Sequence, residues 1–176
     1  MREDHMAHEL KDILLRQLEA AMCTLNQCID SCPPAEWDEA HDDAPFSQVL
    51  FHTLFYTDFY LEESEEAFKA QGYHADRADM FKDYEELENR PATWLYTKTE
   101  IRDYFSFCLA KIRRQLVADD EASLLADSRL GRRVLPRAEK CMILVRHIQH
   151  HAAQLGLVLQ KPTGKNLAWV SSGWKE

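Results

Sequence analysis

Four long segments of the chain repeat apolar residues every three or four positions, and no segment shows the sustained alternation of a half-buried strand. An apolar stripe with this period is stable in water only when it packs against other stripes. The pattern therefore predicts an all-α fold, a four-helix bundle in which helices of 20 or so residues share one core. The four predicted helices cover about 7–29, 46–70, 97–117 and 136–161.

Start and stop signals support these boundaries. The prolines at 33–34 cannot continue a helix, so the first one ends before them. Thr97 and Glu100 have the spacing of a capping box, which predicts the start of the third helix. Gln71-Gly72 is expected to end the second helix, and Pro162 the fourth.

The connections are about 32–45, 71–96 and 118–135. The middle one is the longest, and 79–87 within it can form a short helix. The tail after residue 163 contains two tryptophans and is expected to pack back on the bundle. We predict that residues 1–176 form a single domain.

Charge and composition exclude several classes of protein. The 21 basic and 30 acidic residues give a net charge of −9, which disfavours binding to nucleic acid or anionic membrane. No apolar run approaches the roughly 20 residues of a membrane helix, and the N-terminus lacks the apolar core of a signal peptide. A cytoplasmic protein is expected. The five cysteines are expected to be buried free thiols.

The eight histidines fall into two groups. At 100° per residue, His147 and His151 lie in the apolar stripe of the fourth helix and His150 lies on its flank. A buried imidazole needs a hydrogen-bond partner or a metal ion. Four others are expected to be solvated at the surface: His5, His8, His41 and His74.

A third histidine converges with this pair. Two histidines four residues apart can chelate one ion. His52 lies on the apolar stripe of the second helix, and inward side chains of different helices meet in a bundle core. His52, His147 and His151 are therefore predicted metal ligands, with open positions typical of a catalytic site. The alternative is three separate core histidines, each with its own hydrogen bonds.

The sequence at these residues resembles the DinB-like superfamily, whose YfiT-type members are described as metal-dependent hydrolases. The family hallmark is a histidine on the second helix, matched by His52, and two on the last helix, matched by His147 and His151. The HRGQ-like stretch of many members corresponds to 151–154, where Gln154 is kept and the Arg-Gly is not.

This resemblance implies a bundle of up-down-down-up order, with its long crossover between helices 2 and 3. It implies a divalent ion (zinc, nickel or an iron-like metal) and, in many members, a homodimer. Characterised relatives include thiol-dependent S-transferases and mycothiol-dependent maleylpyruvate isomerases. A low-molecular-weight thiol is therefore a candidate co-substrate, and a small molecule is the expected substrate.

Several other polar residues lie near the predicted ligands in the sequence or on the same helices. Asp58 lies at −120° from His52 and is not expected to be a ligand. Tyr56 lies at 40° from His52, so it can be a proton donor, a substrate contact or a core tyrosine. The glutamates at 62–66 are expected to form a solvated helix end. The arginines at 132, 133 and 137 can bind an anion or simply lie at the surface.

The sequence favours an enzyme that transfers a low-molecular-weight thiol to an electrophile. Hydrolysis needs a base beside the metal, and Tyr56, the nearest candidate, is a better acid than base at the ordinary tyrosine pKa of about 10. A metal-dependent hydrolase and a non-catalytic bundle that binds a ligand or partner remain the alternatives. No catalytic residue is assigned beyond the three predicted ligands.

Overall fold

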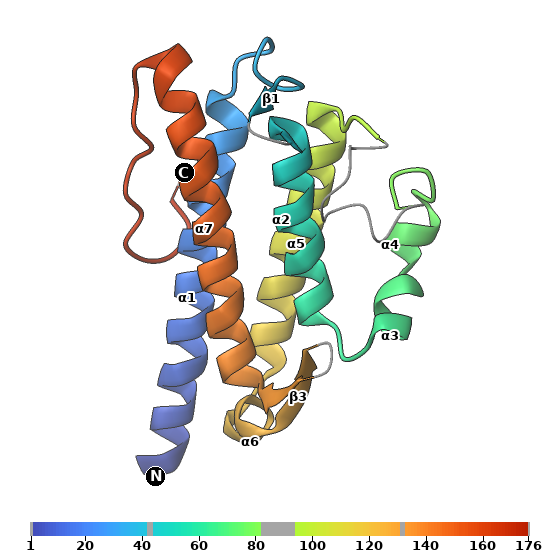
Figure 1. Ribbon diagram of the computed structural model, residues 1–176. Helices are drawn as coiled ribbons and strands as arrows, with labels where there is room; N and C mark the ends of the chain where they lie inside the picture. Colours follow the sequence, from blue (N-terminus) through green and yellow to red (C-terminus); the bar gives the residue numbers. More distant parts are fainter. Residues whose placement is uncertain (1, 42–43, 82–93, 131–132, 176) are drawn as a thin grey trace.

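The computed structural model describes residues 2–41, 44–81, 94–130 and 133–175 (Figure 1). Within these ranges the chain is mostly helical, which confirms the all-α class. The helices are α1 (Arg2–Ser31), α2 (Phe46–Leu61), α3 (Glu65–Lys69), α4 (Gly72–Ala75), α5 (Lys98–Ala118), α6 (Glu121–Leu125) and α7 (Arg137–Thr163). The strands are β1 (Ala40–His41), β2 (Ala44–Pro45), β3 (Asp127–Leu130) and β4 (Arg133–Pro136).

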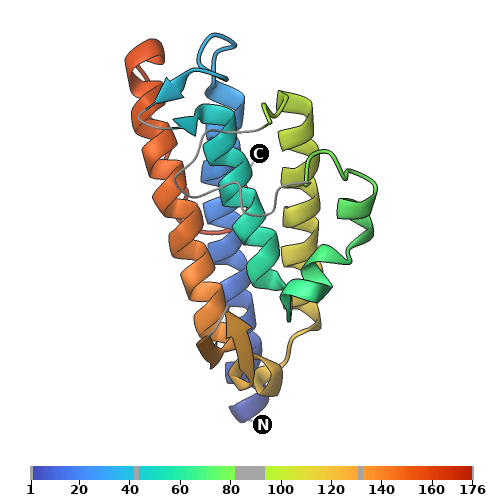
Figure 2. The same ribbon diagram turned by 45° about the vertical axis from the view of Figure 1, so that its right-hand side comes forward.

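The four long helices lie side by side (Figures 1 and 2). Helices α1 and α7 run in one direction, and α2 and α5 run in the other. Each of α1 and α2 contacts both α5 and α7. Their apolar stripes meet in one core, in which Leu18, Leu54, Ile112 and Ile148 are fully buried. No described helix has both the length and the apolar character needed to cross a membrane.

The start of α5 was predicted correctly. The Thr97 hydroxyl accepts a hydrogen bond of 3.2 Å from the Glu100 backbone N–H. The Glu100 carboxylate accepts one of 2.7 Å from the Thr97 backbone N–H. These two bonds form the expected capping box and satisfy two of the free donors at the helix start.

The prediction of one helix over 46–70 was wrong. Helix α2 ends at Leu61, and Glu62 takes up an extended conformation with φ −87° and ψ 160°. The Ser64 hydroxyl then accepts a hydrogen bond of 3.1 Å from the Ala67 backbone N–H and begins α3. An N-cap of this kind competes with continuation of the preceding helix, so the helix is interrupted before Ser64 and a new one begins after it. Helices α3 and α4 then extend beside α2 (Figure 1).

The end of α7 also differs from the prediction. Pro162 lies inside the last turn, and the helix ends after Thr163. A proline so near the end removes one of the last helical hydrogen bonds but does not stop the helix at once. Gly164 ends it in the left-handed conformation, with φ +65°, which glycine adopts without steric cost.

Two short antiparallel hairpins, β1–β2 and β3–β4, were not predicted. They lie in the connections and lead directly into α2 and α7. Of the short helix considered at 79–87, residues 79–81 form a turn and the remainder lies outside the described residues.

The C-terminal tail packs back on the helices, as expected. Val170 is buried against Ala20 and Cys23 of α1, and the Trp174 ring lies 6.0 Å from that of Phe105. Trp169 does not take part, because it is 83% exposed.

Candidate metal centre

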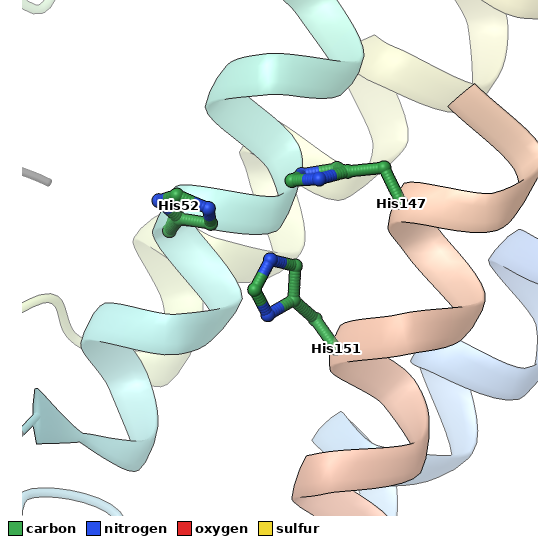
Figure 3. A group of neighbouring side chains, drawn as sticks. All are labelled: His52, His147 and His151. Carbon is green, nitrogen blue, oxygen red and sulfur yellow. The ribbon is translucent and has the colours of Figure 1, made fainter. Parts of the chain in front are cut away.

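The structure brings together the three histidines that the sequence singled out. His52 from α2 and His147 and His151 from α7 point toward one another (Figure 3). The ring centroids are 5.3 Å apart for His52 and His147, and 4.6 Å apart for each pair that includes His151. One nitrogen of each ring lies within 4.8 Å of the others.

Burial keeps these imidazoles neutral. It lowers the pKa of His52 to about 4, helped by the nearby His151 and His150. Burial and the neighbouring histidines lower the pKa of His147 to about 3. The pKa of His151 is lowered for the same reason, although its hydrogen bond to Gln154 acts in the opposite direction. At pH 7 each ring therefore keeps a lone pair, the form in which histidine binds a metal ion.

The hydrogen bonds leave lone pairs available inside the cluster. The Nε2 atom of His147 is buried and has no hydrogen-bond partner among the described residues. In His151, Nδ1 lies 2.8 Å from Oε1 of Gln154. Because the amide oxygen can only accept, Nδ1 carries the proton and Nε2 is left as an acceptor. This is the pattern in which a second residue fixes the tautomer of a metal-binding histidine.

The donor set fits a divalent transition metal. Imidazole nitrogen suits zinc, nickel, iron and copper. Zinc–nitrogen bonds of about 2.0–2.1 Å place two tetrahedral ligands roughly 3.4 Å apart, so small rotations of the rings close the observed separation. Three protein ligands leave at least one position open. Among the described residues, no carboxylate or cysteine joins this group.

Two neighbours of the cluster behave as their helical positions suggest. The Tyr56 ring is half-buried, with its centroid 4.9 Å from that of His52 and 5.6 Å from that of His147. Tyr56 is therefore within reach of the centre. His150 is exposed and its ring contacts that of His151 from outside, at 4.9 Å.

A second polar cluster, which the sequence analysis missed, surrounds Asp58 on another face of α2. Its carboxylate is fully buried and accepts hydrogen bonds from Tyr104 Oη at 3.0 Å and from His74 Nε2 at 2.8 Å. The expectation that His74 is solvated was wrong, since it is only 2% exposed. The side chains of His5, His8 and His41 lie outside the part that the structure describes.

Lys111 completes this Asp58 cluster. Its ammonium is buried and pairs with the carboxylates of Asp58 and Glu62, and it donates a hydrogen bond of 2.9 Å to Gln71. Glu62 is thus not part of a purely solvated helix end. Burial raises the pKa of Asp58, but the hydrogen bond from His74 and the charge of Lys111 outweigh it and hold the pKa below its usual value. The cluster fastens α4 and the residue before it to α2 and α5.

Other candidate residues lie away from the histidines. The five cysteines are buried and free, as predicted. Arg137 donates two hydrogen bonds, of 2.8 and 3.0 Å, to Asp119 and lines a cavity of about 690 Å³ between the ends of α2 and α5 and strand β3. Arg133 is exposed, and Arg132 lies outside the described residues. Binding of an anion by these arginines remains a prediction.

Comparisons with known proteins leave the chain without an assigned family. No protein-family model matches the sequence, and neither the curated proteins nor the solved structures include a significant match. The residues of the centre are therefore the basis for assigning a function.

Proposed function

We propose that this chain is a DinB-like four-helix bundle that holds one divalent ion with His52, His147 and His151 and uses it in catalysis. The observation that carries the proposal is the buried, unpartnered Nε2 of His147 inside a cluster of three neutral imidazoles. Leaving a buried polar atom unpaired costs about 1–3 kcal/mol, a cost that binding of an ion offsets.

The arrangement of the long helices supports the bundle and its up-down-down-up order. The two outer members in sequence, α1 and α7, are parallel to each other, and α2 and α5 run opposite to them (Figure 1). The connection between α2 and α5 spans residues 62–97, the longest between successive long helices. A long crossover is what two consecutive parallel helices require.

The reaction that we propose is transfer of a low-molecular-weight thiol to a small electrophile. A divalent ion at this centre would supply positive charge that favours the deprotonated form of a thiol. The chain contributes three nitrogen donors, of which Gln154 orients that of His151, and places the Tyr56 ring beside them. With a chlorinated electrophile a carbon–sulfur bond forms, chloride leaves with the bonding pair, and the thiol proton passes to solvent.

No carboxylate of the described residues joins the three histidines. This favours transfer over hydrolysis, because water must lose a proton to a base during its attack. The one acidic residue of α2, Asp58, is buried and already pairs with Lys111, His74 and Tyr104. A thiol is more acidic than water and reaches its reactive form without such a base.

The test is to incubate zinc-loaded protein with a panel of low-molecular-weight thiols and a chlorinated or epoxide electrophile. Conjugation is expected to need both the metal and His147, and the exposed His150→Ala variant serves as the matched control. Turnover of simple esters or amides without a thiol, and none with one, would overturn the transferase proposal in favour of a hydrolase. Metal binding without any turnover would point to a ligand-binding bundle.

A further inference from the structure

A small aromatic pocket lies next to the histidine cluster, between α2 and α3. Its volume is about 130 Å³, and it is lined by Phe55, Tyr56, Phe59, Glu65, Phe68 and Lys69. Four of these six residues present aromatic rings. Glu65 and Lys69 form an exposed ion pair of 2.5 Å at the edge. Aromatic side chains combined with a few polar groups are typical of small-molecule sites.

The rings of the pocket wall pack edge to face on one another. The Phe68 ring meets that of Phe55 edge to face at 4.9 Å and that of Phe59 at 5.2 Å. Tyr56 meets Phe59 in the same manner at 6.2 Å. Aromatic groups favour such edge-to-face contacts. An apolar cavity of about 150 Å³ binds benzene, so a pocket of about 130 Å³ is close to that size and has room for no more than one ring.

Tyr56 connects the pocket to the histidines. Its side chain forms part of the pocket wall, and its ring centroid lies 4.9 Å from that of His52 and 5.6 Å from that of His147. A ring in the pocket is therefore separated from the cluster by a single side chain. The Tyr56 ring is thus the wall that the pocket and the histidine cluster share.

We infer that this pocket binds the aromatic ring of the substrate, so that the substrate is a benzyl-sized aromatic electrophile. The inference rests on the proposed function, because it places the ring relative to a metal held by the histidines. Binding of the ring itself needs only the side chains of α2 and α3.

The experiment measures ¹⁹F NMR of 4-fluorobenzyl alcohol with metal-free, zinc-loaded and cobalt-loaded protein. The probe is expected to bind all three forms. Cobalt, being paramagnetic, should broaden the fluorine signal of the bound probe well beyond the effect of zinc, since this relaxation falls steeply with distance. The visible absorption of cobalt reports independently whether the metal has bound.

Two variants locate the probe, each with a matched control. Phe59→Trp fills the pocket and should weaken binding at least tenfold, whereas Phe107→Trp, the same substitution at a half-buried position on α5 outside the pocket, should change it less than twofold. Glu65→Trp covers the edge from an exposed position where misfolding is not a concern. Its control is Glu66→Trp, which makes the same substitution one residue further along α3.

The outcomes separate this inference from the proposed function. Cobalt broadening that is lost with Phe59→Trp or Glu65→Trp, but kept in both controls, supports the pocket. If cobalt binds but the probe does not, or if cobalt does not broaden the fluorine signal of the bound probe beyond the effect of zinc, the inference is wrong and the metal centre stands. Binding that neither pocket variant weakens also overturns the inference. Absence of cobalt absorption overturns the proposed function, and the pocket then stands only if Phe59→Trp or Glu65→Trp still weakens binding of the probe to metal-free protein.

Discussion

Helix α2 takes part in two polar clusters that differ in how their hydrogen bonds are satisfied. On one face, the Asp58 carboxylate is fully buried and receives hydrogen bonds or charge from His74, Tyr104 and Lys111. On another, His52 meets His147 and His151, and Nε2 of His147 has no partner among the described residues. The Asp58 cluster is complete in the protein alone, whereas the histidine cluster lacks a binding partner.

This difference in hydrogen bonding suggests different roles, stability for the Asp58 cluster and function for the histidine cluster. A buried network whose members are all paired fixes the positions of the elements that it joins. A cluster that leaves a buried atom unpaired keeps a cost in the folded state, which a bound ion would offset. The Asp58 cluster should therefore respond to mutation with a loss of stability, and the histidine cluster with a loss of metal binding.

The largest expected effect is that of Asp58→Ala on stability. The substitution leaves the buried Lys111 with only part of its compensation, and breaking a buried ion pair costs about 3–5 kcal/mol. The free energy of unfolding, measured with urea at pH 7, should fall by that amount. The exposed Glu63→Ala serves as the control and should stay within about 0.5 kcal/mol. A loss below 1 kcal/mol for Asp58→Ala would mean that the cluster does not stabilise the fold.

Metal removal should have a smaller effect and should leave the protein folded. An ion that binds only the folded state stabilises it by about 2.7 kcal/mol when its free concentration is a hundred times its dissociation constant. Chelation should therefore lower the melting temperature, and the His147→Ala variant should show no such dependence. Complete unfolding by chelator would indicate a structural rather than a catalytic ion.

Acid should act on the two clusters in different pH ranges. The unfolded chain takes up protons at His52 and His147 near pH 6.5, whereas burial lowers their folded-state pKa values to about 4 and 3. Protons then favour the unfolded state, so the stability of the metal-free protein falls as the pH decreases below 6.5. Between pH 6.5 and 5.5, protonation of these two histidines in the unfolded chain lowers the free energy of unfolding by at most about 2 kcal/mol.

Asp58 contributes to the pH dependence of stability at lower pH than the histidines do. Its folded-state pKa is held below the usual value, so its contribution is present above about pH 4, the unfolded pKa, and is lost as the pH falls below that. Urea unfolding across this range, compared with a His52→Gln, His147→Gln double variant, separates the two contributions. An unchanged slope between pH 6.5 and 5.5 in the double variant would contradict the assignment.

A smaller effect is expected for Gln154→Leu. The substitution keeps the size of the side chain but removes the acceptor that orients His151. Loss of such an outer contact lowers metal affinity by about tenfold or somewhat more. Gln149→Leu, the same change elsewhere on α7, is the matched control. Isothermal titration with zinc measures both, and equal affinities would show that Gln154 has no part in the centre.

Much of the histidine cluster could be predicted from the sequence, because helical periodicity fixes the direction of a side chain around its axis. The stripes that contain His52 and His147 had to face the core, and in a bundle such stripes meet. The third histidine of the cluster, His151, follows from its spacing of four residues from His147. The aromatic pocket could not be predicted in this way, since α3 exists only because Ser64 interrupts the preceding helix.

The Asp58 cluster was missed for a related reason. His74 comes from a short helix within the crossover, where no periodicity reports which side chains are buried. A signal was nevertheless present, because Asp58 and Lys111 occupy inward positions, four residues after Leu54 and three after Cys108. Opposite charges on two facing stripes indicate a buried ion pair. The sequence does not show which residue of the crossover, here His74, contacts this pair.

The most direct test of the account is the metal stoichiometry of untagged protein, measured by elemental analysis and zinc titration for the native chain and four alanine variants. We predict about one ion per chain, with most binding lost in His52→Ala, His147→Ala and His151→Ala and little change in His150→Ala. If none of the tested ions binds, or if His150→Ala and His151→Ala lose metal binding equally, the assignment of these three histidines as the ligands is contradicted.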